Sequence, residues 1–174
     1  MRSYTELFHN HTSDDIFQNF EQKFKSALYE EYPHLSLFYI DCYTIDQYQE
    51  LERVPKFAEL KKDAFAYSIE VKIVEEQHTI FAAVIFSPTL CKTFNFSEEE
   101  KYAAIAHEIG HIIHYFNENL KDAGIMMIEI KADEVAIKLG LAEPLKSVLQ
   151  KLKLSKFYSC EQCQLIDFRM SVLN

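Results

Sequence analysis

The 174-residue sequence has no tryptophan and contains only three glycines, four prolines and four cysteines. So little glycine and proline excludes collagen-like and linker-rich chains, and an apolar fraction of 48% excludes a disordered one. Four cysteines are too few for a disulfide scaffold in a chain of this length. The sequence is therefore typical of a globular protein whose core does not depend on cross-links.

Positive charge is scarce, because 18 Lys and Arg residues stand against 27 Asp and Glu residues, a net charge of −9 at pH 7. Such a surface repels phosphate backbones and anionic lipids, so we expect neither nucleic acid nor a membrane as a partner. No apolar run approaches the roughly 18 residues that a bilayer span needs, and no apolar leader opens the sequence. We therefore expect a cytoplasmic protein with reduced cysteines.

The hydrophobic pattern of the first half predicts one helix followed by a small sheet. Apolar residues recur at helical spacing over residues 14–31, after a possible cap at Ser13 and before Pro33. Runs of β-branched and aromatic residues predict strands over residues 35–44, 66–74 and 78–86, and the polar stretch 46–62 predicts a helix. The last two strands are separated by a gap of hairpin length. We therefore expect a mostly antiparallel sheet.

The second half predicts helices only, so the fold class is α+β. Local signals mark where these helices begin and end: a capping box at Ser97 and Glu100, Gly140 after a helix over 125–139, Pro144 in a first turn, and a second capping box at Ser159 and Gln162. The first of these helices can run through Phe116. We expect residues 1–142 to form one domain and residues 143–174 to form a helical extension packed on it.

The helix that opens at Ser97 contains the motif HEIGH, residues 107–111. Histidines four residues apart, His107 and His111, lie on one helical face, so both imidazoles can bind a single zinc ion. Glu108 flanks that face, where its carboxylate can take a proton from a water molecule at the metal. The motif predicts a catalytic zinc site, which normally needs a third protein ligand.

The next predicted helix offers carboxylates for that third position. Glu129 and Asp133 are four residues apart and share a face with two alanines, Ala132 and Ala136. Small residues on this face, opposite Gly110 on the first helix, allow the two helices to approach closely. Glu129 and Asp133 are therefore both candidates, while Glu134 points about 100° away from their face.

The combination His107-Glu108-x-x-His111 with Glu129-x-x-Ala132-Asp133 resembles the gluzincin metallopeptidases, and among them the ImmA/IrrE-type peptidases. The resemblance implies a zincin-like fold, zinc bound by His107, His111 and Glu129, and Glu108 as general base. It also implies that Asp133 accepts a hydrogen bond from a ligand imidazole and orients it. The implied partner is a peptide or protein substrate.

Other histidines and cysteines carry weaker signals. His114 lies about 10.5 Å along the helix from His107, too far to share one ion with both motif histidines, so we expect it to be a partly buried neighbour of the site. Cys160 and Cys163 have no partner C-x-x-C motif, so we interpret them as ordinary helix cysteines. To His9 and His11, near the terminus, we assign no role.

Three functional interpretations compete at this point. The sequence favours a zinc-dependent peptidase, in which Glu108 moves the proton from water to the leaving amine. The alternatives are a zinc module without catalysis and a protein-interaction domain without zinc. For the peptidase, we expect the substrate to pair as an extended strand with an edge of the sheet, along residues 78–86.

Overall fold

The computed structural model describes residues 6–50, 66–74, 79–115, 117, 120, 122–155 and 158–173, without the side chains of residues 48–50 and 66–79. The chain divides into two compact units, Met1–Pro88 and Thr89–Asn174. Within the described ranges, no helix combines the length and the apolar character needed to cross a membrane. Most of the helix predicted over residues 46–62 and the connection at residues 75–78 lie outside the described residues.

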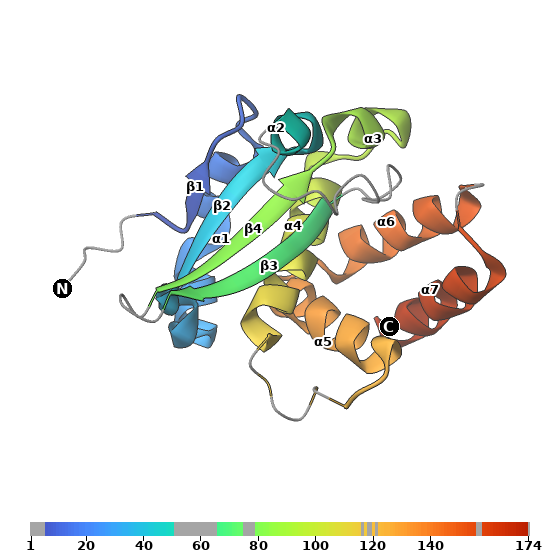
Figure 1. Ribbon diagram of the computed structural model, residues 1–174. Helices are drawn as coiled ribbons and strands as arrows, with labels where there is room; N and C mark the ends of the chain where they lie inside the picture. Colours follow the sequence, from blue (N-terminus) through green and yellow to red (C-terminus); the bar gives the residue numbers. More distant parts are fainter. Residues whose placement is uncertain are drawn as a thin grey trace. The chain divides into compact units, whose positions relative to one another are not determined.

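The first unit contains a four-stranded mixed sheet with the strand order β1-β2-β4-β3 (Figure 1). Its strands are β1 (Phe8–Asn10), β2 (Phe38–Thr44), β3 (Ala66–Val74) and β4 (Thr79–Phe86). β2 pairs in parallel with both β1 and β4, and only β3 and β4 are antiparallel. The expectation of a mostly antiparallel sheet is therefore wrong, although the α+β class is confirmed.

The parallel pairing of β1 and β2 follows from the helix between them. The chain runs from β1 through α1 (Ile16–Glu31) to β2, and a helical crossover of this kind returns the chain in the same direction. β1 has only three residues, too few for a recognisable alternation, so the sequence pattern did not reveal it. β4 lies between β2 and β3, so its backbone is paired on both sides and it is not the free edge expected for residues 78–86.

The core of this unit lies between α1 and one face of the sheet. The buried residues of α1 follow the predicted helical spacing: Ile16, Phe17, Phe20, Phe24 and Leu28. The Phe17 ring meets Phe8 of β1 and Phe86 of β4 at centroid distances of 5.4 and 5.9 Å. A 3₁₀ helix, η1 (Pro33–Leu37), occupies the beginning of the strand predicted over 35–44, and a short helix α2 (Ile45–Glu50) follows β2.

The second unit is helical, as predicted, and follows the short helix α3 (Pro88–Thr93). Its helices are α4 (Glu98–His114), α5 (Ile125–Lys138), α6 (Ala142–Leu154) and α7 (Cys160–Val172). Both predicted capping boxes form, at Ser97 and at Ser159, and Gly140 ends α5 with a φ of +75°. Local signals thus placed these helix boundaries to within a few residues.

The buried carboxylate of Glu100 joins α4 to α6. It accepts hydrogen bonds from the Ser147 hydroxyl at 2.6 Å and the Lys151 ammonium at 2.7 Å, besides the capping bond from the Ser97 amide. These bonds compensate the loss of hydration that burial of a carboxylate costs. One capping residue therefore both starts α4 and connects it to α6.

Candidate metal centre

The two motif histidines of α4 point at the same place in space. His107 is buried and His111 is half-buried, and their Nε2 atoms are 3.1 Å apart. Their spacing of four residues places them one helical turn apart on one face, which brings the two rings together edge to face at a centroid distance of 4.6 Å. Two imidazole nitrogens therefore face a common position.

Helix α5 crosses α4 in very close contact at Gly110, the only glycine of α4. A Cβ atom on Gly110 would lie 2.4 Å from the carbonyl oxygen and 2.6 Å from the Cα of Ala132. Because no side chain fits at Gly110, the absence of a Cβ atom there sets the distance between the two helices. This contact brings the carboxylate face of α5 next to the histidines.

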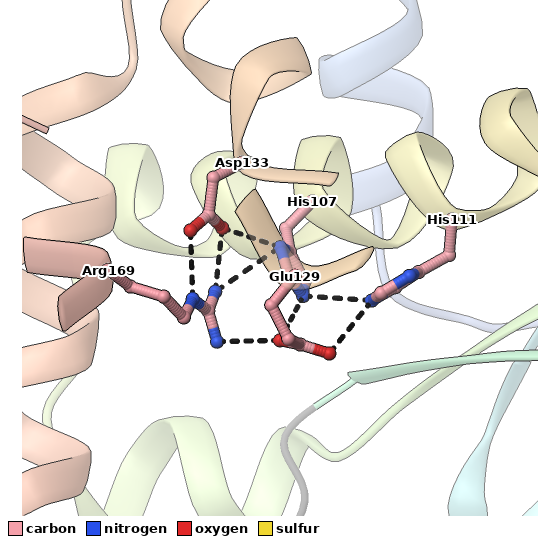
Figure 2. A network of polar contacts seen from close by, with 5 residues as sticks. All are labelled: His107, His111, Glu129, Asp133 and Arg169. Carbon is pink, nitrogen blue, oxygen red and sulfur yellow. Dashed lines mark hydrogen bonds and ion pairs between the residues drawn. The ribbon is translucent and has the colours of Figure 1, made fainter. Parts of the chain in front are cut away.

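Glu129 completes a three-residue donor group with His107 and His111 (Figure 2). Its Oε2 lies 3.4 Å from Nε2 of His107, and its Oε1 lies 3.5 Å from Nε2 of His111. Tetrahedral zinc with bonds of about 2.0–2.1 Å places its ligand atoms about 3.3–3.4 Å apart. The donor spacing and the two-imidazole, one-carboxylate chemistry therefore fit a bound metal ion.

Asp133 and Arg169 lie behind these donors. Oδ1 of Asp133 lies 2.7 Å from Nδ1 of His107, which holds that ring with Nδ1–H toward Asp133 and Nε2 toward the metal position. Arg169 of α7 donates to both oxygens of Asp133, from Nε at 2.8 Å and from Nη2 at 2.6 Å. Its Nη1 donates to Oε2 of Glu129 at 2.8 Å. One guanidinium thus holds both carboxylates in place (Figure 2).

The network shifts the pKa values of its members in opposite directions. Burial and Arg169 disfavour the charged form of His107, but hydrogen bonds to Asp133 and Glu129 raise its pKa to about 9. Burial and the nearby His107 lower the pKa of His111 to about 4. Burial opposes ionisation of Glu129, yet His107 and Arg169 lower its pKa to about 2. At neutral pH the metal-free site therefore holds one proton that a metal ion on Nε2 of His107 must displace.

The remaining residues named from the sequence lie around this group. Glu108 is half-buried on α4, and its charge contributes to the raised pKa of Arg169, which places its carboxylate near the network. Glu134 instead pairs with Lys131, at 2.6 Å between Nζ and Oε1, and is not among the three donors. His114 is half-buried and is likewise outside the donor group. Cys160 and Cys163 are free thiols on α7.

Arg169 is the residue of the network that the sequence analysis missed. It lies on α7 between the buried Ile166 and the buried C-cap residue Leu173, at positions i, i+3 and i+7. A charged residue on the apolar stripe of a helix requires a buried partner. The arginine on this stripe was therefore the signal in the sequence that could have indicated a buried ion pair. Its partners are in a helix about forty residues earlier, so the pairing itself had no local signature.

Comparison with known proteins does not assign this site to a family. No family model, no curated protein and no solved structure matches the chain.

Proposed function

We propose that the chain is a zinc-dependent peptidase whose metal is held by His107, His111 and Glu129. The observation that carries the proposal is the spacing of the three donors, 3.1 to 3.5 Å, at the place where Glu108 follows the first histidine. Two imidazoles and a carboxylate suit zinc, and three protein ligands leave a position open. Zinc, when bound, polarises a scissile carbonyl and lowers the pKa of a water molecule.

The protein's own residues supply positioning and proton transfer. Glu108 accepts a proton from the attacking water and delivers it to the leaving amine. Asp133 holds a proton on Nδ1 of His107, so Nε2 is the nitrogen that would bind the metal once its own proton is displaced. Arg169 pairs with both Glu129 and Asp133, so the half-buried and the buried carboxylate can stay ionised side by side.

Substitution of Glu108 by Gln tests the proposal. An amide cannot accept the proton, so E108Q should bind zinc like the wild type while peptide hydrolysis falls by about two to four orders of magnitude. Hydrolysis is measured on an unfolded protein and on a mixed-sequence fluorogenic peptide pool, with zinc content determined on the same samples. E99Q, an exposed carboxylate on the same helix, is the matched control and should retain full activity.

The same samples separate the alternatives. Zinc binding without hydrolysis in the wild type would identify a zinc module without catalysis. A wild-type protein that takes up no zinc would favour a protein-interaction domain. Loss of zinc from E108Q would place Glu108 among the ligands and overturn its role as base.

A further inference from the structure

A second cluster of metal-binding side chains lies in the first unit, on the sheet. Three residues each offer a donor atom: His9 of β1, His11 just after β1, and Asp41 of β2. These atoms lie within 4.8 Å of one another. The register of the parallel pair places His9 beside Asp41. Residues two apart on a strand point to the same face, so His9, His11 and Asp41 share one face of the β1–β2 pair.

That face is opposite to the core. Phe8, Ile40 and Cys42 alternate with the cluster residues and are buried, while His9 and His11 are exposed and Asp41 is half-buried. A metal ion at this place is accessible from solvent without any rearrangement of the core.

The cluster side chains are held by their neighbours. Nδ1 of His9 lies 2.7 Å from the Tyr39 hydroxyl, and the ring of His11 stacks on Tyr43 at a centroid distance of 4.5 Å with the planes 1° apart. Nε2 of His11 lies 2.7 Å from Oδ1 of Asp41. Contacts of this kind to the outer part of a ligand ring fix its orientation in metal sites.

We propose that His9, His11 and Asp41 form a second, surface metal site for a divalent transition ion that prefers imidazole, such as zinc. The donors are two imidazoles and a carboxylate, as in the candidate metal centre of α4 and α5, but here they lie on the β1–β2 pair and face solvent. Tetrahedral binding needs ligand atoms about 3.3 Å apart. The donor atoms now lie between 2.7 Å, from Nε2 of His11 to Oδ1 of Asp41, and at most 4.8 Å apart. Binding therefore requires the shortest separation to widen by about 0.6 Å and the longer ones to close by at most about 1.5 Å. Water completes the coordination.

The consequence of binding is a clip between β1 and β2. β1 is a three-residue edge strand, and the His11 amide continues its pairing by donating to the Cys42 carbonyl at 2.9 Å. An ion that joins His9 and His11 to Asp41 binds only the paired state. It therefore stabilises the docking of the N-terminal segment on the sheet.

Zinc titration of the chelator-stripped full chain tests this proposal. The wild type should bind two zinc ions, and H9A/H11A should bind one. H34A, which removes another exposed histidine of the same unit, is the matched control and should still bind two. E129A removes a donor of the other centre, so E129A should bind one zinc ion, at the surface site. That ion should be lost in H9A/H11A/E129A. Failure of the proposed peptidase site and failure of the surface site therefore give different zinc stoichiometries.

Two site-resolved readings complete the test. In ¹⁵N spectra, zinc should shift the amide signals of residues 8–11 and 39–43 in the wild type and in E129A. Hydrogen exchange of the His11 amide should slow about 100-fold at zinc concentrations 100 times Kd. D41N, which keeps an oxygen acceptor for His11 but loses the charge, should weaken this binding at least tenfold. Equal zinc stoichiometry in wild type and H9A/H11A, or no change in the β1 and β2 amides, would overturn the proposal and leave an ordinary ion pair between His11 and Asp41.

Discussion

Replacing Gly110 by alanine tests whether the contact between α4 and α5 positions the metal donors. The added Cβ would lie 2.4 Å from the carbonyl oxygen of Ala132, whereas non-bonded heavy atoms settle at about 3.5 Å, so α5 must retreat by roughly 1 Å. Metal ligand distances tolerate only about 0.2 Å. The bond between His107 and Asp133, now 2.7 Å, would be lost by the same displacement.

The two energetic effects of this substitution partly offset each other. Overpacking costs about 1–3 kcal/mol, and alanine gains about 1 kcal/mol over glycine within a helix. We therefore expect the free energy of unfolding to fall by about 0–2 kcal/mol, while zinc affinity falls at least tenfold. Urea denaturation of the metal-free protein and competition with a zinc chelator measure the two quantities separately.

Gly124 is the matched control, because a Cβ there meets no heavy atom within 4 Å. G124A should keep the wild-type zinc affinity and lose at most about 1 kcal/mol of stability, since glycine caps a helix better than alanine. If G110A bound zinc as tightly as G124A, the close crossing would have no part in setting the donor geometry. The reasoning would then be refuted even if G110A were less stable.

Three further outcomes are expected. Chelator competition should show zinc binding at the proposed His107, His111 and Glu129 site nearly abolished in E129A, weakened about 10–100-fold in D133A, and unchanged in E134A. In the proposed site Glu129 is a ligand, Asp133 orients a ligand, and Glu134 faces elsewhere. Greatest damage from E134A would withdraw Glu129 as the ligand. With the pKa of His107 at about 9, zinc uptake at pH 7 should release about one proton, and affinity should rise about tenfold per pH unit until it levels off near pH 9. Calorimetry in two buffers of different protonation enthalpy measures this release, which should be near zero if His107 is already neutral. R169M should lower the free energy of unfolding of the metal-free protein by about 1.5–3 kcal/mol, because the buried Asp133 loses its hydrogen bonds to Arg169 and, among the described residues, keeps only protonated His107 as a cationic partner. A loss below about 1 kcal/mol would show that the guanidinium is not needed to keep that carboxylate in place.

The sequence by itself determined the features that depend on neighbours within one or two helical turns. The pair His107 and His111 lies on one face because four residues span about one turn, whatever surrounds the helix. The capping boxes at Ser97 and Ser159 likewise need only residues three positions apart. The small residues Gly110 and Ala132 even indicated the helix crossing, because close approach has few alternatives.

Only the tertiary structure decided which distant segments meet. The sheet became mixed because β4 inserts between β2 and β3, and no local pattern states which strand will be the neighbour of another. Arg169 joins the candidate metal centre because α7 packs on α5, and the cluster of His9, His11 and Asp41 forms because β1 and β2 pair in register. Periodicity reports which face of an element is buried, whereas the choice of partner depends on the free energy of the whole packed chain, which is a sum over non-local contacts.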